Sequence, residues 1–213
     1  MYKRQSQWSP PSPDPSGLAY RAASNTLWVS DAEVEEMPPY FAGANVFETT
    51  TAGNLDATFS TTAFTNEPAG VTMNPGNGHV FFSDDDRETI YEVDVGPDGL
   101  YGTADDSVTS LDTTLFNCFD PEGLGFGQGN LFIADGDGAE IYILAPGVNG
   151  IFDGVPPAGD DQATSFDTSG LGQLNPEGVE FNPESGTLYI VSNSPDADVV
   201  ETTTSASGLL LTM

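Results

Sequence analysis

The sequence is poor in basic residues. It has four Lys and Arg residues against thirty-three Asp and Glu residues, which gives a formal net charge of −29 over 213 residues. Because such a polyanion repels phosphate backbones and anionic lipid headgroups, we expect neither nucleic acid nor a membrane surface as a partner. The charge must be offset by cations or spread over a surface in a saline medium. Bound divalent metal and a saline habitat both stay open.

Cysteine and histidine are almost missing as well. Cys118 is the only cysteine, so there is no disulfide framework and no cysteine-based metal site, and its apolar neighbours predict a small core residue. His79 is the only histidine. Catalysis by a Ser-His or Cys-His pair and a histidine-rich zinc site are therefore not expected. A Gly-x-Ser-x-Gly nucleophile elbow is also absent.

Long hydrophobic runs are absent too. No stretch approaches the ~18 apolar residues that span a bilayer, so we expect no membrane insertion. Residues 1–13 are polar and rich in proline, unlike the apolar region of a signal peptide, and they hold Lys3 and Arg4. We interpret residues 1–13 as a non-native or disordered leader.

The sequence does contain a repeat. Four Pro-x-Gly-apolar segments begin at Pro15, Pro68, Pro121 and Pro176, and the prolines recur every 53 to 55 residues. Each segment is followed by a turn rich in Gly, Asn or Ser, and then by an apolar run with a polar end. These runs are 27–31, 80–84, 131–135 and 188–193.

Further short runs follow within each repeat. A third run occurs at 46–49, 90–93, 141–144 and 199–202, and a fourth at 108–111 and 163–166. The runs are β-branched and aromatic and are bounded by Gly, Pro, Asn and Asp, which is typical of strands. Four strands in about 50 residues are typical of a β-propeller blade. A β-sandwich is the alternative, but it does not explain the constant spacing.

The repeat also resembles known propellers. The pattern Pro-Glu-Gly-Leu-x-Phe, then Leu-Phe-Ile-Ala-Asp, then Glu-Ile-Tyr, over residues 121–142, resembles the NHL-repeat and gluconolactonase/senescence-marker propellers, and the phytase-related ones. The resemblance covers about residues 14–213. It implies an all-β propeller and is specific for architecture rather than activity.

Four blades are expected, at about 14–66, 67–119, 120–174 and 175–213, with the last one truncated. Residues 197–209 match 44–55, but the sequence then ends where the first copy continues. Because the families named above usually close with five or six blades, we expect a four-blade fragment of such a ring. A closed four-bladed ring is the alternative.

Blade topology gathers acidic residues at one mouth of the central channel. The start of each innermost strand and the end of the second strand share this face, where several oxygen ligands would converge as a hard cation requires. The candidate residues are Glu122, Glu177, Asp31, Asp84, Asp135 and Asn193. In gluconolactonase-like propellers a comparable set holds the catalytic metal, which the resemblance implies for the two glutamates. Capping of the following turn is the alternative role for the aspartates.

Two enlarged loops on the opposite face, 96–106 and 147–161, combine paired aspartates with glycines. Such loops resemble the Asp/Gly calcium loops of secreted bacterial proteins, so we expect Ca²⁺ here and an extracellular or periplasmic location. Solvated β-turns are the alternative. The candidate ligands are Asp98, Asp105, Asp106 and Asp112 in the first set, and Asn149, Asp153, Asp160, Asp161 and Asp167 in the second.

Two functions follow from these features. The first is a calcium-binding extracellular propeller that acts as a binding or scaffold module for an unknown small molecule or extracellular protein. The second is part of a metal-dependent hydrolase of the lactonase or phosphoesterase kind, in which the channel-mouth metal activates a carbonyl, phosphoryl group or water.

Overall fold

A computed structural model of the chain describes residues 8–193 and 199–203. In this part of the chain the strands form four antiparallel sheets, each a blade in chain order. Blade 1 consists of β1 (Pro15–Arg21), β2 (Thr26–Asp31), β3 (Val46–Thr50) and β4 (Leu55–Phe59). Blade 2 consists of β5 (Val71–Met73), β6 (Val80–Asp84), β7 (Thr89–Asp94) and β8 (Ser107–Asp112). Blade 3 consists of β9 (Pro121–Gly127), β10 (Asn130–Asp135), β11 (Glu140–Ala145) and β12 (Gln162–Asp167). Blade 4 consists of β13 (Pro176–Asn182), β14 (Thr187–Ser192) and β15 (Val200–Thr203).

The second strand of an inner blade is buried on both faces. In β10, Leu131 and Ile133 pack toward blade 2, whereas Phe132 and Ala134 pack toward blade 4. Because successive side chains of a strand point to opposite faces, a strand between two blades needs apolar residues at every position. This explains the continuous apolar runs that precede the polar strand ends.

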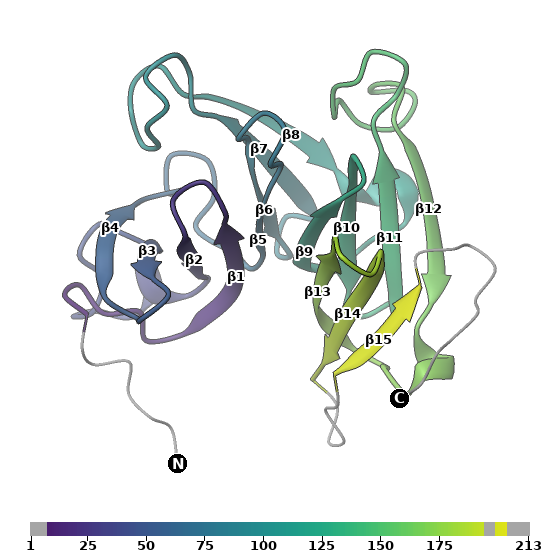
Figure 1. Cartoon of the computed structure of the whole chain (residues 1–213), viewed down its shortest axis with the longest axis horizontal. Helices are drawn as coiled ribbons and strands as arrows, with labels where there is room; N and C mark the ends of the chain where they lie inside the picture. Colours follow the sequence, from purple (N-terminus) through teal and green to yellow (C-terminus); the bar gives the residue numbers. More distant parts are fainter. Residues whose placement is uncertain (1–7, 194–198, 204–213) are drawn as a thin grey trace.

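The innermost strands lie side by side around a common centre. Figure 1 shows β1, β5, β9 and β13 at the middle of the molecule, with β4 and β12 at its outside. The glycine of the repeat makes this approach possible. A Cβ on Gly17, Gly70 or Gly123 would meet backbone atoms of the next blade at 2.8, 2.4 and 2.5 Å. The chain is a four-bladed β-propeller.

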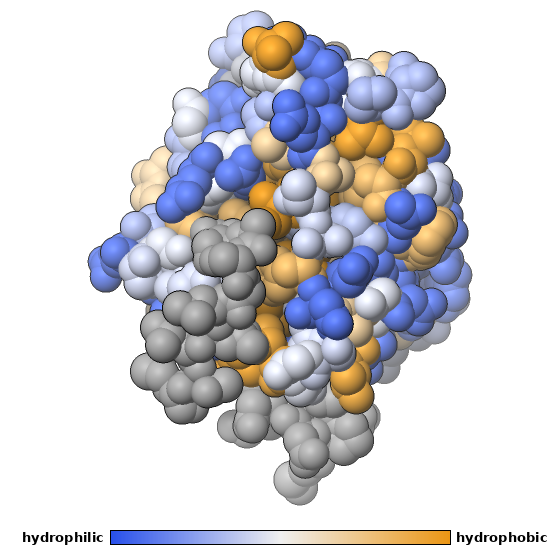
Figure 2. Space-filling model, turned by 90° about the vertical axis from the view of Figure 1, so that its right-hand side faces the viewer, coloured by the Kyte–Doolittle hydropathy of each residue, from blue (hydrophilic) through white to orange (hydrophobic). Residues whose placement is uncertain are grey.

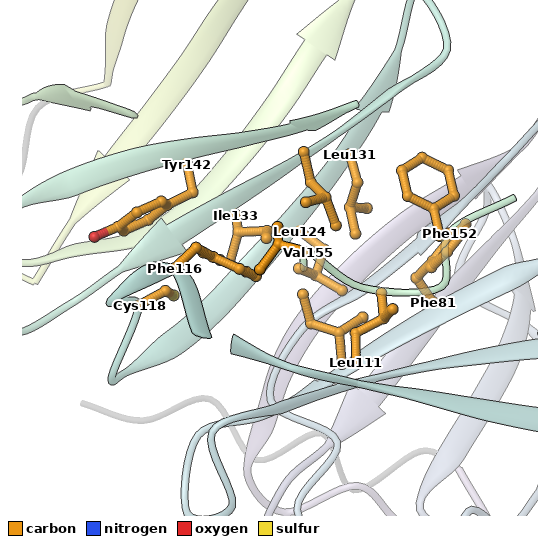
Figure 3. Close-up of a cluster of buried hydrophobic side chains, with 12 residues drawn as sticks. Phe81, Leu111, Phe116, Cys118, Leu124, Leu131, Ile133, Tyr142, Phe152 and Val155 are labelled. Atoms are coloured by element: carbon orange, nitrogen blue, oxygen red, sulfur yellow. The ribbon is translucent and has the colours of Figure 1, made fainter. Parts of the chain in front are cut away.

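The hydrophobic cores lie between blades. The core between blades 2 and 3 brings Phe81 of β6 against Leu124 and Leu131 of blade 3, and Phe152 of the long loop closes it (Figure 3). Phe81 and Phe126 stack at 5.9 Å, and Phe132 and Phe181 stack at 5.7 Å across the next interface. Aromatic residues of the strands therefore join the blades together.

Three short 3-10 helices lie between strands. η1 (Val34–Glu36) joins β2 and β3 within blade 1, whereas η2 (Thr113–Phe116) and η3 (Ser169–Leu171) connect blade 2 to blade 3 and blade 3 to blade 4. Cys118, just after η2, is fully buried in the core between blades 2 and 3, as expected for a small core residue. Burial raises the pKa of its thiol.

The described part of the leader lies against blade 1. Trp8 stacks on Phe47 at 5.7 Å, and the Ser12 hydroxyl donates to Asp31. That residues 1–13 are foreign to the fold stays a prediction, and residues 1–7 lie outside the described part. The all-β propeller of four blades is confirmed, and the β-sandwich alternative is excluded. Membership of a larger ring and the blade boundaries stay predictions.

Candidate cation site at the channel mouth

Five carboxyl groups from three blades gather at one mouth of the channel. Two of them lie next to the repeat prolines of blades 2 and 3, and two lie in innermost strands. The fifth follows the second strand of blade 2. They are Glu67, Asp120, Glu122, Glu177 and Asp85. Each keeps partial solvent exposure, so an ion from solution can reach it.

Three of these carboxyl groups are close enough to share one ion. Oxygen atoms of Asp85, Asp120 and Glu122 lie within 4.8 Å of one another. A missing side chain makes room for them, because a Cβ on Gly136 would lie 2.5 Å from a carboxylate oxygen of Asp120. The Oδ1 atom of Asp85 is buried and has no hydrogen-bond partner among the described residues. An oxygen-preferring cation would satisfy this acceptor.

Burial and mutual repulsion raise the pKa of every group in this cluster. Desolvation, then repulsion by Asp85 and other acids, raises the pKa of Glu67 and of Glu122 to about 8. Burial is also the first cause of the raised pKa values of Asp85, Asp120 and Glu177. The charged forms are therefore disfavoured unless positive charge is supplied.

The protein does not supply that positive charge in the described part of the chain. There, Arg21 pairs with Glu48, Arg87 pairs with Asp84, and His79 pairs with Glu92, so none of them forms an ion pair with the five carboxyl groups. A divalent cation fits this donor set, since all the groups are oxygen ligands and together carry excess negative charge.

The aspartates at the ends of the second strands have other contacts. Asp31 accepts hydrogen bonds from Ser12 Oγ and the Asp14 amide. Asp84 accepts from Thr65 Oγ1 at 2.6 Å and the Arg87 amide at 3.0 Å, and Asp135 from the Gly138 amide at 3.3 Å. These three side chains are buried and hold the adjoining loops in place.

Asn193 and Glu177 are the two remaining residues predicted for this mouth besides Glu122. The Asn193 side chain is exposed, and its backbone amide donates to the Asn175 carbonyl. Burial first, and then repulsion by Asp120 and Asp85, raises the pKa of Glu177. Of the six predicted residues, the structure thus brings Glu122 and Glu177 to the cluster.

In the loop 96–106, backbone amides donate hydrogen bonds to the carboxylates of the same loop. Asp106 Oδ2 accepts from the Gly102 and Thr103 amides at 2.7 and 3.2 Å, and Asp105 accepts from the Asp98 amide and Thr103 Oγ1. Hydrogen bonds from Thr103 are the main cause that lowers the pKa of Asp105. Asp98 caps its own turn by accepting from the Leu100 amide.

Carboxylates of the loop 147–161 also accept hydrogen bonds from backbone amides of their own loop. Buried Asp161 accepts from the Gly147 and Gly154 amides at 3.2 and 2.8 Å. Asp153 accepts from the Asp160 amide and the Asn149 side chain, and Asp160 accepts from the Val148 amide. Carboxylate oxygens of Asp153, Asp160 and Asp161 lie within 4.8 Å of one another, so this loop could also hold a cation.

Two residues predicted for these loops lie elsewhere. Asp112 and Asp167 are the last residues of β8 and β12, at the far ends of strands that begin beside the loops. Asp112 caps η2 by accepting from the Thr114 amide, and Asp167 accepts from the Ser169 amide. The structure does not bring either one to the loop aspartates.

Sequence reasoning missed Glu67, Asp85 and Asp120. A signal exists for two of them, because the residue before each repeat proline is acidic or amide-bearing: Asp14, Glu67, Asp120 and Asn175. Asp85 follows Asp84 directly and has no acidic equivalent in the other blades, where Ala32, Gly136 and Asn193 stand. Nothing in the repeat pattern marks it.

Comparisons with known proteins agree with the fold. No protein-family profile and no curated protein matches the chain. Solved structures do match: a luciferin-regenerating enzyme has a TM-score of 0.58 at 14% identity, over 87% of this chain and 60% of that chain. A candidate 6-phosphogluconolactonase from Bacteroides uniformis has a TM-score of 0.53 at 12% identity, over 95% of this chain and 57% of that one.

A third match is named as a propeller. A β-propeller domain from Myceliophteria thermophila has a TM-score of 0.51 at 9% identity, and the match covers 89% of this chain and 54% of that domain. These likenesses show the fold alone. The chain spans about half the length of several of the solved chains that it matches.

Proposed function

We propose that this protein is a divalent-cation-binding β-propeller, with Ca²⁺ as the ion and Asp85, Asp120 and Glu122 as its ligands. The observation that carries the proposal is their grouping within 4.8 Å, with raised pKa values and no basic partner in the described chain. Bound Ca²⁺ would stabilise the charged forms of these groups and would neutralise their mutual repulsion.

Calcium suits this site better than a transition metal. All the ligands are hard oxygen donors, and His79, the only histidine, is occupied by Glu92 at 2.6 Å. Partial exposure of the ligands leaves room for the waters that complete six to eight coordination.

The role that we propose is a binding or scaffold module outside the cytoplasm. Extracellular calcium modules bind with dissociation constants of about 0.1 to 1 mM, which an open, partly exposed site can provide. A net charge of −29 keeps such a protein soluble and away from polyanions. None of the helices in the described ranges is both long and apolar enough to span a bilayer.

Calorimetry and thermal unfolding test the proposal. The metal-free full chain is titrated with CaCl₂, and its melting temperature is followed at the same concentrations. We expect a binding event that the double variant Asp120→Asn/Glu122→Gln weakens at least tenfold. Glu184→Gln is the matched control, because Glu184 is exposed in the β13–β14 turn and its loss should leave binding unchanged.

Variants of the loop aspartates test whether calcium binds in the loop 147–161 instead. If Asp153→Asn/Asp160→Asn removes the calcium binding and the channel-mouth variant retains it, the ion belongs to the loop 147–161. Absence of calcium binding in every variant and in the parent chain would reject the calcium function altogether.

A second candidate, a metal-dependent hydrolase, is supported by Glu67. Its pKa of about 8, raised by burial and then by repulsion from Asp85, one of the three proposed ligands, suits a proton acceptor at neutral or slightly alkaline pH. Two of the structural neighbours are enzymes by name. A metal held there would polarise a carbonyl or phosphoryl oxygen, or lower the pKa of a bound water.

Turnover of lactones and phosphate esters with added metal separates the two candidates. For the hydrolase we expect Glu67→Gln to lower turnover by about 100-fold or more while calcium affinity stays within about threefold. A chain that binds calcium and turns over no substrate in the panel is the binding module.

A further inference from the structure

The last blade has an uncovered apolar face. In blade 3 the corresponding face is formed by Phe132, Ala134 and Ile141, which are at most 1% exposed because blade 4 covers them. The equivalent residues of blades 1 and 2 are fully buried as well: Trp28, Ser30 and Val46, and Phe81, Ser83 and Ile90.

The strand register identifies the same positions in blade 4. In blade 3, Ala134 pairs with Ile141. In blade 4, Ile190 pairs with Val200, so the next residue along β14, Val191, lies opposite Val199. Tyr189, Val191 and Val199 are therefore the equivalent residues, and they are 36%, 41% and 66% exposed. Figure 2 shows hydrophobic residues in a broken band between hydrophilic ones on the side of the molecule that faces right in Figure 1.

Blade 1 has the complementary uncovered face. The apolar residue of each repeat segment packs against the preceding blade, and Val71, Leu124 and Val179 are only 1%, 3% and 5% exposed. Their equivalent in blade 1 is Leu18, which is 60% exposed, and Tyr20 on the same face is 56% exposed. The chain thus carries both halves of one more interface of the kind it already contains three times.

The two faces do not close on each other. A Cβ on Gly17, Gly70 or Gly123 would collide with the next blade, but a Cβ on Gly178 would meet only Val191 of its own blade. Residues of both faces, Leu18 of blade 1 and Tyr189, Val191 and Val199 of blade 4, line a cavity of about 280 Å³ that runs along the innermost strands.

We propose that a second copy of this chain covers both faces, head to tail, so that two copies close one ring of eight blades. The blade 4 face of each copy would pack on the blade 1 face of its partner. Tyr189 would then stack on Tyr20 of the second copy, as Phe81 stacks on Phe126 and Phe132 on Phe181 within the chain. Two reciprocal contacts of this kind satisfy twofold symmetry.

Continuity with the internal interfaces and the length of a propeller domain support this occupant. The chain spans 54% of a solved β-propeller domain, so two copies supply about one domain length of blades. Charge opposes association, because each copy carries −29 and Glu180 pairs with Tyr189 on the face. We therefore expect the dimer to strengthen with salt, which screens this repulsion.

Sedimentation velocity of the full chain tests the proposal, over about 1 to 100 µM protein in 0.5 M NaCl. We expect a species of twice the chain mass. Tyr189→Glu and Tyr20→Glu should each raise the dissociation constant about tenfold or more, because each variant buries a charge at the centre of the contact. Val148→Asp is the control, since Val148 is fully exposed in the loop 147–161.

Mixing the variants distinguishes head-to-tail contact from other arrangements. A Tyr189→Glu copy still offers an intact blade 1 face to the intact blade 4 face of a Tyr20→Glu copy. The mixture should therefore form a heterodimer with one sound interface, although each variant alone is monomeric. Circular dichroism checks that both variants fold, and Val191→Ser with Leu18→Ser repeats the test without added charge.

Three results would overturn the proposal. A parent chain that is monomeric at every concentration would mean that a second copy does not cover these faces. A dimer that survives Tyr20→Glu, or variants that fail to complement each other on mixing, would mean a different contact. Species that keep growing with concentration would exclude closure by two copies.

Discussion

The channel mouth and the loops of the opposite face are both rich in carboxylates, but the hydrogen-bond partners of these carboxylates differ. In the loop 147–161, Asp161 is buried and receives two backbone amides. At the mouth, Asp85 Oδ1 is buried with no partner among the described residues, and Asp120 and Glu122 repel it at short range.

The difference shows that the number of acidic residues does not identify a cation site. A carboxylate that accepts backbone amides has partners for its charge, although burial still raises the pKa of Asp161. A buried carboxylate among other acids is stabilised only by a proton or by an added cation. One buried carboxylate oxygen in each region, Asp85 Oδ1 at the mouth and Asp160 Oδ1 in the loop 147–161, has no hydrogen-bond partner among the described residues. The loops have the more recognisable sequence, whereas at the mouth the pKa values of all five carboxyl groups are raised.

The largest effect should come from removing a satisfied loop carboxylate. Asp161→Ala leaves the Gly147 and Gly154 amides without their acceptor in a buried setting. We expect the free energy of unfolding to fall by about 2 to 3 kcal/mol in urea at pH 7. Asp56→Ala, an exposed charge deletion in β4, is the control and should change little. A loss below about 0.5 kcal/mol for Asp161→Ala would contradict the structural role.

The pH dependence of stability should separate the two regions. Glu67 and Glu122 have pKa values of about 8 in the fold against 4.5 as the ordinary value, so the folded state holds protons that the unfolded state releases. Without metal, the free energy of unfolding should therefore fall by about 2 kcal/mol from pH 5 to pH 8, and level off above pH 8.

Calcium should reduce that fall, since the ion replaces the protons at the mouth. The carboxyl groups with lowered pKa values act at lower pH. Hydrogen bonds lower the pKa of Asp105 in the loop 96–106 and of Asp167 at the end of β12, so the contribution of both groups is lost only as the pH falls below the ordinary value of 3.8. Urea unfolding between pH 3 and pH 9, with EDTA or CaCl₂, measures both. Metal-free stability that rises from pH 5 to pH 8 would count against the raised pKa values at the mouth.

Neutralising one mouth carboxylate should stabilise the metal-free protein. Glu122→Gln removes a partly buried charge that Asp85 and Glu177 repel. We expect a gain of about 1 kcal/mol at pH 8 in EDTA, together with weaker calcium binding. Glu184→Gln should leave both quantities unchanged. A less stable Glu122→Gln protein would mean that the glutamate has a structural partner.

The smallest effect is expected in the loop 96–106. Asp105 is exposed there, and its hydrogen bonds to Thr103 and the Asp98 amide lie in solvent. Asp105→Asn should leave the melting temperature unchanged within error in EDTA and in calcium. A clear loss of the calcium-dependent rise would place an ion in this loop.

The sequence predicts the fold well because the repeat has a packing cause. The Pro-x-Gly segment recurs since Gly17, Gly70 and Gly123 must let the next blade approach the backbone. The continuous apolar run of β10 follows from burial on both faces. Strand chemistry and spacing therefore agree on one architecture.

The site was less predictable because side-chain direction at a strand end depends on the local turn. Asp84 and Asp135 stand beside the mouth in sequence, but loop amides donate to their carboxylates, and neither belongs to the group whose oxygens lie within 4.8 Å of one another. Asp120 reaches the cluster through space that Gly136 leaves empty. A periodic pattern gives the position of a residue in a blade and does not give such contacts.

Anomalous diffraction from crystals grown with Ca²⁺ or Mn²⁺ tests the central claim most directly. We expect a peak at the channel mouth, with oxygen atoms of Asp85, Asp120 and Glu122 at about 2.1 to 2.6 Å. A peak confined to the loop carboxylates Asp153, Asp160 and Asp161, with none at the mouth, would contradict it.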